Sequence, residues 1–150
     1  VHRSEVRHRS TCAVQGNYMN QQMNYLALAF GGAIGTVFRY LIGSAAYEYL
    51  KTPAFPWGTL VVNLAGSFVI GLLAGWNDSS PMQPNFRLFL FTGVLGGFTT
   101  FSAYSLETIN LFRNSMSGYA WINILCSNIG GIALAAAGFR IMKMLYATSA

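Results

Sequence analysis

Four stretches of the chain are apolar over the length that a membrane-spanning helix requires, and this feature constrains the fold more than any other. A hydrocarbon core about 30 Å thick needs about 20 mostly apolar residues in a helix. The stretches that qualify are approximately residues 24–47, 57–76, 88–106 and 119–139. Short segments rich in Pro, Asn, Ser and Gly, which are typical of turns, connect them. The sequence therefore predicts an all-α integral membrane protein with four transmembrane helices.

The scarcity of charge supports this class. Of 150 residues, 53% are hydrophobic and only 9% are Asp, Glu, Lys or Arg, whereas a soluble domain carries about 25%. This composition excludes a disordered chain and an ordinary cytosolic enzyme. The net charge of +5 includes several charges in the first nine residues, so it does not indicate a nucleic-acid partner, and we expect none.

The first 22 residues differ from the rest of the chain. They are polar, show no apolar period and lack the apolar core of a signal peptide. The sequence opens on Val1, and Met23 directly precedes the first span. We interpret residues 1–22 as a disordered leader upstream of a true start at Met23, with a real cytoplasmic tail as the alternative. Residues 23–150 form the predicted membrane subunit.

The placement of lysine and arginine outside the spans bears on orientation in the membrane. Without the leader, Arg87, Arg140 and Lys143 fall on one side, and Lys51 and Arg113 fall on the other. Three positively charged residues against two is almost no bias between the two sides of the membrane. This near balance indicates that the chain can insert in both orientations. A bundle of four helices is too small to enclose much by itself, so we also expect an oligomer.

Glycines recur at a spacing of four residues within the first three spans. Small residues at this spacing let helix backbones approach closely in lipid. The pairs are Gly31 and Gly35, Gly71 and Gly75, and Gly93 and Gly97. Helix packing accounts for most of these glycines.

Polar residues inside the spans indicate a pathway, because buried polar groups in a membrane are costly. Asn123 and Ser127 are four residues apart and share one helix face. Adjacent glycines followed by the Thr99–Thr100 pair weaken the third helix. A broken helix exposes backbone groups that can bind ions, so the third span is the candidate ion site.

Three segments resemble the CrcB/Fluc family of fluoride channels. They read GGAIGTVFRY (31–40), GTLVVNLAGSFVIG (58–71) and GVLGGFTTFSAYSLE (93–107). The resemblance covers approximately residues 23–145, with the segments in the family's order. It implies a multi-pass protein of the cell inner membrane that allows passive fluoride efflux and lowers cytoplasmic fluoride. It also implies an antiparallel, dual-topology homodimer in the lipid bilayer, with the third helix broken mid-membrane.

The resemblance further implies roles for individual residues. A structural sodium ion at the dimer centre would be held by the backbone carbonyls of Gly96 and Thr99, and we expect glycine at position 96 for its conformational freedom. The ion pathway would include Asn63, Phe101, Tyr104, Asn123 and Ser127, and the vestibule Arg39 and Glu107. Aromatic rings have a positive edge that can face an anion. Tyr104 stands where the family commonly has Phe.

Other classes of function are disfavoured by the residues. The only histidines are His2 and His8, and the carboxylates are scattered, so we expect no enzyme. A small four-helix proton-coupled exporter is the alternative, but it requires an embedded carboxylate, and Glu48 lies only at the end of the first span. A non-transporting assembly factor would not need the polar track of the fourth span.

Overall fold

The computed structural model describes the backbone of residues 2–51 and 54–149 and the side chains of residues 21–51 and 54–148. The described chain is helical. Its elements are α1 (His2–Leu50), α2 (Trp57–Ser79), α3 (Pro84–Arg87), the π-helical segment η1 (Leu88–Leu95), α4 (Gly96–Phe98), α5 (Phe101–Arg113), α6 (Ser117–Leu125), the π-helical segment η2 (Cys126–Gly130) and α7 (Gly131–Ser149).

These elements make four helical spans that are long and apolar enough to cross a membrane, which confirms the prediction from hydropathy. The spans are Gln21–Leu50, Trp57–Ser79, Pro84–Arg113 and Ser117–Thr148. The backbone of α1 is helical from His2 onward, through the stretch for which we expected no order. The boundary between leader and subunit at Met23 stays a prediction.

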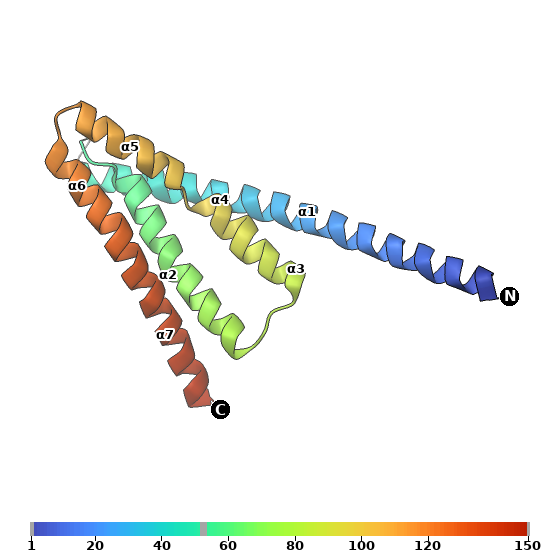
Figure 1. Cartoon of the computed structure of the whole chain (residues 1–150). Coiled ribbons are helices and arrows are strands. Elements are labelled where there is room, and N and C mark those ends of the chain that lie inside the picture. The colour runs from blue at the N-terminus through green and yellow to red at the C-terminus, as the bar shows by residue number, and fades with distance from the viewer. Residues whose placement is uncertain (1, 52–53, 150) are drawn as a thin grey trace.

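The first and third spans pack against each other through their glycines. Helix α1 lies along η1 and α4 (Figure 1). A Cβ atom on Gly31 would lie 2.7 Å from the carbonyl oxygen of Phe89, and one on Gly35 would overlap the carbonyl oxygen of Val94. The backbones of the two spans are therefore in direct contact, and these glycines serve packing as predicted.

The second and fourth spans form the other close pair, α2 against α7 (Figure 1). A Cβ atom on Gly71 would overlap the carbonyl oxygen of Ala135, and one on Gly75 would lie 2.8 Å from that of Phe139. The bundle thus consists of two glycine-packed helix pairs, joined where α1 also contacts α2.

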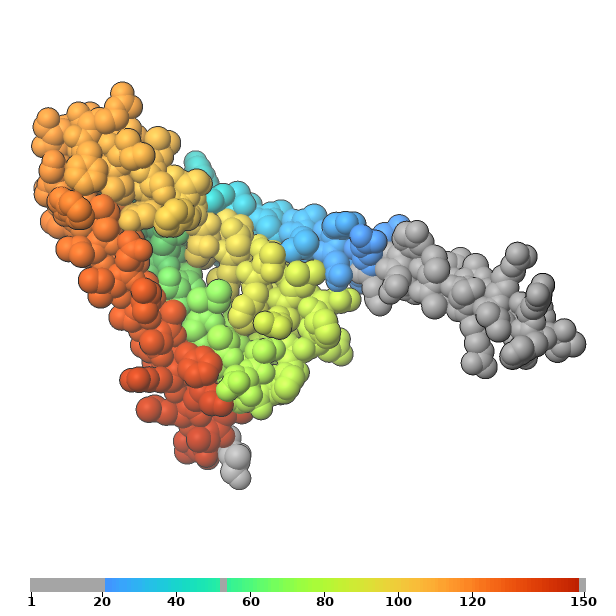
Figure 2. Space-filling model, viewed as in Figure 1, coloured from blue at the N-terminus to red at the C-terminus, as the bar shows by residue number. Residues whose placement is uncertain are grey.

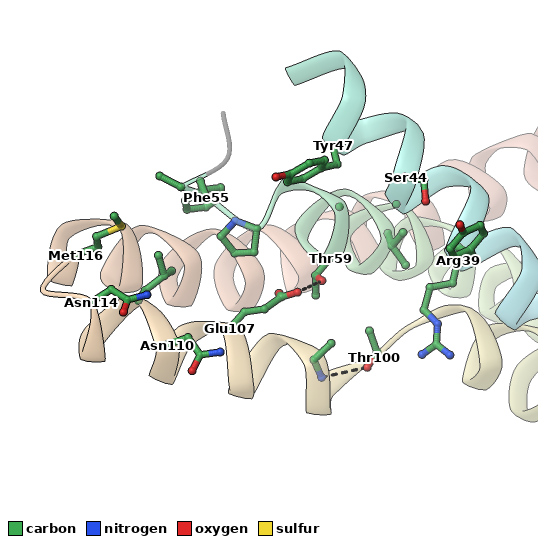
Figure 3. A pocket seen from close by; sticks show the side chains of 18 residues that line it. Arg39, Ser44, Tyr47, Phe55, Thr59, Thr100, Glu107, Asn110, Asn114 and Met116 are labelled. Carbon is green, nitrogen blue, oxygen red and sulfur yellow. Dashed lines mark hydrogen bonds between the residues drawn. The ribbon is translucent and has the colours of Figure 1, made fainter. Parts of the chain in front are cut away.

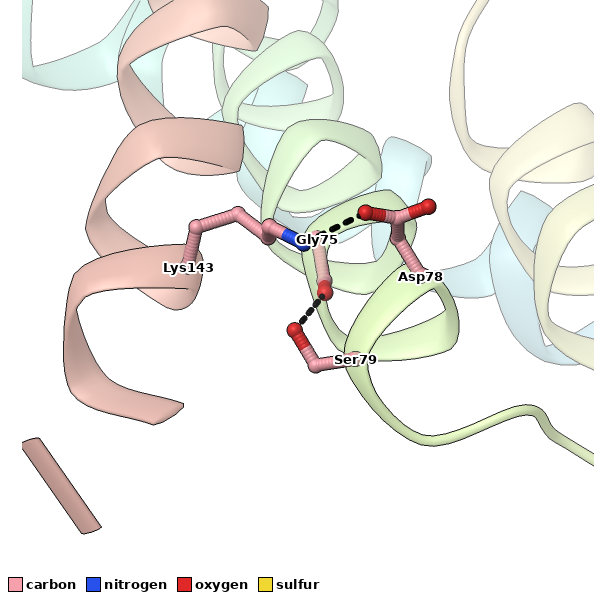
Figure 4. A network of polar contacts seen from close by, with 4 residues as sticks. All are labelled: Gly75, Asp78, Ser79 and Lys143. Carbon is pink, nitrogen blue, oxygen red and sulfur yellow. Dashed lines mark hydrogen bonds and ion pairs between the residues drawn. The ribbon is translucent and has the colours of Figure 1, made fainter. Parts of the chain in front are cut away.

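A salt bridge joins the C-terminal end of α2 to α7 (Figure 4). Lys143 Nζ lies 2.6 Å from Asp78 Oδ2, and both side chains are exposed. Beside it, the hydroxyl of Ser79 donates to the carbonyl of Gly75 at 3.0 Å. Exposed ion pairs contribute little stability, so the glycine contacts hold this helix pair together.

The third span changes its neighbour where the helix is interrupted. Thr99 and Thr100 are extended, with ψ of 158° and 112°, between α4 and α5. Before them, η1 and α4 pack on α1, and after them α5 packs on α6 (Figure 1). The interruption therefore carries the chain from the first span across to the fourth.

The buried core within one subunit is small. Val62, Leu95 and Phe98 form its cluster, whereas Tyr40 and Phe101 are 72% and 75% exposed. Figure 2 shows α3 and η1 standing apart from α7, with α2 visible between them. So much exposed apolar surface fits a chain covered by lipid and by other protein.

Candidate functional site

The side chain of Asn63 on α2 forms hydrogen bonds with the backbone of the third span at its interruption. Its Oδ1 accepts from the N–H of Thr100 at 2.8 Å, and its Nδ2 donates to the carbonyl oxygen of Thr100 at 3.1 Å. The two bonds determine which end of the amide carries nitrogen. One hydrogen of Nδ2 is used on Thr100, and the other has no acceptor among the described residues.

At the interruption, two backbone carbonyls of the third span lack the N–H donors that a continuous helix would give them. In a continuous α-helix the N–H of Thr100 would donate to the carbonyl of Gly96, and that of Ala103 to the carbonyl of Thr99. Here the N–H of Thr100 donates to Asn63. The N–H of Ala103 donates to the Thr100 hydroxyl at 3.2 Å, which caps α5. The carbonyls of Gly96 and Thr99 are the two for which the family resemblance implies a role in holding sodium, a role that stays a prediction.

The conformation of Gly96 corrects one expectation. Its φ of −64° and ψ of −37° are ordinary helical values, so the conformational freedom of glycine is not needed at this position. A Cβ atom there would meet nothing within 4 Å in the subunit. The packing of a single subunit therefore does not require glycine at position 96.

An inner cavity of about 440 Å³ lies beside the interruption. It gathers most of the predicted pathway residues: Asn63 from α2, Phe101 and Tyr104 from α5, and Ser127 from η2. Gly96, Thr99 and Asn128 also line it. None of the described residues that line this cavity is charged.

The two aromatic rings at the inner cavity contact each other. The ring centroids of Phe101 and Tyr104 lie 5.4 Å apart, and the ring planes are tilted by 47°. Phe101 is mostly exposed, whereas Tyr104 is half-buried. The hydroxyl oxygen of Tyr104 accepts from Asn128 Nδ2 at 3.0 Å. The structure thus brings together the aromatic pair that the sequence suggested.

Asn123 does not line the inner cavity. Its side chain is 1% exposed, and its Nδ2 donates to the hydroxyl of Thr108 at 2.9 Å. That hydroxyl donates to the carbonyl of Tyr104 at 2.7 Å. Asn123 therefore joins α6 to α5 inside the subunit. The two side chains that sequence spacing placed on one helix face do lie next to each other, but Ser127 lines the inner cavity and Asn123 is turned into the contact with α5.

Asn123 nevertheless contacts the pathway residue on its own span. Its Oδ1 accepts from the hydroxyl of Ser127 at 3.4 Å. This contact is long for a hydrogen bond between oxygen and oxygen, so the Ser127 hydroxyl is only weakly held.

An outer cavity of about 730 Å³ contains both predicted vestibule residues (Figure 3). Oε1 of Glu107 accepts from the hydroxyl of Thr59 at 2.7 Å, whereas its buried Oε2 has no partner among the described residues. Arg39 reaches the same cavity from α1. Thr100 lines both cavities, so the interrupted segment separates the inner from the outer space.

Sequence reasoning missed Thr59 and Thr108, and it assigned no contacts to Thr100 and Asn128. Thr59 precedes Asn63 by four residues, a spacing that places both on one helix face and that was available as a signal. Asn128 was visible as a polar residue inside a span, but its contact with Tyr104 depends on how two distant helices pack.

A family model described as "CrcB-like protein, Camphor Resistance (CrcB)" matches residues 26–139, which is more than half of the chain. The chain belongs to the CrcB family. The match includes all three segments that carried the resemblance. It also includes the residues that line both cavities. The match ends at residue 139, whereas the fourth span continues to Thr148.

Curated CrcB relatives align over nearly their whole length. A protein of Agrobacterium fabrum is 47% identical over 129 residues, which cover 83% of this chain and 99% of the relative. One of Ruminiclostridium cellulolyticum is 43% identical over 133 residues, covering 88% and 98%. One of Rhizobium meliloti is 46% identical over 128 residues, covering 82% and 99%. Each of the three is named "Fluoride-specific ion channel FluC".

Proposed function

We propose that this CrcB chain is the subunit of a fluoride-selective channel that lets fluoride leave the cell passively and so lowers cytoplasmic fluoride. The curated relatives carry that name at 43–47% identity. The structural observation that supports it is the inner cavity, where Asn63, Phe101, Tyr104 and Ser127 meet without any charged neighbour in the lining. The protein is a channel and not an enzyme.

The chemistry of this cavity suits a small, strongly hydrated anion. Moving an ion of carboxylate size into a medium of low dielectric costs on the order of 20 kcal/mol, and fluoride is smaller. A pathway must replace the lost water with donors, yet hold the ion loosely enough to release it. The free N–H of Asn63, the weakly held hydroxyl of Ser127 and the ring edges of the aromatic pair supply such donors. Asn123 acts on the pathway through Ser127.

The outer cavity serves as the vestibule in this proposal. The guanidinium of Arg39 attracts anions toward the opening. Glu107, held by Thr59, opposes that attraction and tunes the local charge. Thr100 stands between vestibule and inner cavity, and its backbone is held by Asn63.

The channel is proposed to be an antiparallel homodimer in the cell inner membrane, inserted in both orientations. Phe101 is 75% exposed in the single subunit, and Asn128 is exposed within the fourth span. An exposed asparagine inside a span is costly in lipid, so we infer that a second subunit covers this face. The interruption at Thr99–Thr100 would then lie mid-membrane, with both subunits contributing to it.

A sodium ion is proposed to bind at the dimer centre. The carbonyls of Gly96 and Thr99, whose helical donors are engaged elsewhere, are oxygen ligands of the kind that transporters use for sodium at broken helices. The open space at Gly96 leaves room for a second subunit to approach. Replacing sodium by a large organic cation should lower the thermal stability of the purified dimer, and an unchanged melting temperature would count against this site.

The deciding experiment is fluoride efflux from liposomes that contain the purified protein, measured with a fluoride electrode. Efflux should follow the fluoride gradient and the membrane potential alone. A strict requirement for a proton gradient would favour the proton-coupled exporter instead. Chloride efflux under the same conditions measures selectivity.

A further inference from the structure

Tyr104 and Asn128 form a hydrogen-bonded pair at the wall of the inner cavity. Asn128 Nδ2 donates to the Tyr104 hydroxyl oxygen at 3.0 Å and to the carbonyl oxygen of Ile124 at 2.8 Å. Both residues of the pair line the cavity. The pair also joins α5 to the fourth span next to the interrupted segment.

The second of these bonds determines the direction of the first. A backbone carbonyl can only accept, so the amide end that faces Ile124 must be the nitrogen. The same nitrogen is the atom that faces Tyr104, and it carries hydrogens and no acceptor site. The phenolic oxygen is therefore the acceptor in this pair. Its own hydrogen is left over, and no acceptor for it exists among the described residues.

The cavity that Tyr104 lines has no charged residue in its described lining. Of the residues that line the inner cavity, Asn63 also keeps one unused N–H, so two neutral donors border the same volume. A hydroxyl whose oxygen already accepts a hydrogen bond is polarised and donates more strongly. Neutral donors stabilise an anion without the full charge that would trap it.

We propose that the Tyr104 hydroxyl is a hydrogen-bond donor to the permeating anion and that Asn128 is the positioning residue that turns this hydroxyl toward the cavity. The inference rests on the proposed function. It assigns to this chain a donor that a phenylalanine at the same position lacks. The aromatic pair then offers the anion two different groups, a ring edge from Phe101 and an O–H from Tyr104.

The test measures initial fluoride efflux from liposomes as a function of internal fluoride concentration. Tyr104→Phe keeps the ring and should raise the half-saturating fluoride concentration about tenfold to a hundredfold, as expected for losing one bond to a charged group. Asn128→Leu should raise it by a smaller factor, because the hydroxyl remains but is no longer oriented. The double variant should resemble Tyr104→Phe alone, since Asn128 acts through Tyr104.

Two substitutions with synthetic amino acids separate the donor from the shape of the side chain. At position 104, 4-methylphenylalanine matches tyrosine in size and cannot donate, whereas 4-aminophenylalanine donates through its N–H groups. The amino variant should keep the half-saturating concentration near that of the parent, and the methyl variant should behave like Tyr104→Phe. The methyl and amino variants also test the donor role if Tyr104→Phe fails to assemble. Tyr146→Phe, outside both cavities, is the matched control.

The outcomes separate this inference from the proposed function. A conducting parent whose Tyr104→Phe and methyl variants keep the parental concentration dependence would overturn the donor role. Additive effects of Tyr104→Phe and Asn128→Leu would overturn the positioning role of Asn128. A parent that passes no fluoride would overturn the proposed function, and this inference with it.

Discussion

Asn63 and Thr100 are joined by two hydrogen bonds, of 2.8 and 3.1 Å, in which a side-chain amide takes the place of a helical neighbour. The bonds cross from α2 to the third span and hold the backbone where α4 has ended and α5 has not begun. An unpaired peptide group inside a membrane costs several kcal/mol. The interruption is therefore stable because a residue of another span satisfies it.

Asn63 therefore has two proposed roles, in the fluoride pathway and in the stability of the interrupted span, and one substitution tests both. We expect Asn63→Asp to abolish fluoride efflux, because the carboxylate repels the anion and removes the free amide donor. It also loses the bond to the Thr100 carbonyl, so the subunit should lose about 1–3 kcal/mol of stability. Liposome efflux and thermal unfolding in detergent measure the two effects.

The matched control for this change is Asn85→Asp. Asn85 lies in α3, is exposed and lines neither cavity. It should leave both efflux and stability near those of the parent. Normal efflux through assembled Asn63→Asp protein would remove Asn63 from the pathway.

The ring of Phe101 should be essential for conduction. Phe101→Ile fills a similar space but offers no positive ring edge, so we expect most of the fluoride efflux to be lost. Tyr104→Ile should be more damaging than Tyr104→Phe, because it removes ring and hydroxyl together. Efflux rates are compared at equal amounts of assembled protein.

Phe86→Ile is the control for the loss of an aromatic side chain in the third span. Phe86 contacts Trp76, with ring centroids 6.5 Å apart, outside the two cavities. It should conduct like the parent. If Phe101→Ile conducted equally well, the aromatic pair would have no role in permeation.

Gly35 should tolerate no side chain. A Cβ atom in Gly35→Ala would overlap the carbonyl oxygen of Val94, so the first and third spans must move apart. We expect a loss of about 1–3 kcal/mol, typical of overpacking, measured by thermal unfolding in detergent. Gly32→Ala is the matched control, because a Cβ atom there meets nothing within 4 Å. Equal stability of the two variants would contradict the packing described for this helix pair.

Dual topology predicts the location of the C-terminus. A reporter fused after residue 150 of a version that starts at Met23 should be detected on both sides of the membrane, because the charges outside the spans are nearly balanced. Adding three lysines to the loop between α2 and α3, after Ser79 and before Pro84, should shift the population toward one side. Reporter signal on a single side in the version without added lysines would argue against antiparallel assembly.

The sequence by itself determined the class of the protein and the elements of its fold. Spans of this length and apolarity have one stable form in lipid, the helix, because every backbone group must be paired. The glycines at a spacing of four residues could be assigned to helix packing because small residues at this spacing let helix backbones approach closely in lipid. The resemblance to the family then pointed to residues that, with the exception of Asn123, the structure gathers around two cavities.

Only the tertiary structure decided which of these residues share a cavity and what each one binds. The hydrogen bond to Thr108 on α5 keeps Asn123 away from the cavity that Ser127 lines. Asn63 is committed to Thr100 across 37 positions of sequence. The pairing of Tyr104 with Asn128, across 24 positions, is of the same kind. Helical periodicity places neighbours along one helix, whereas contacts between helices depend on how closely their glycines let the backbones approach. The distance between two helix backbones depends on the packing of both helices, so the pattern of residues along one helix does not determine it.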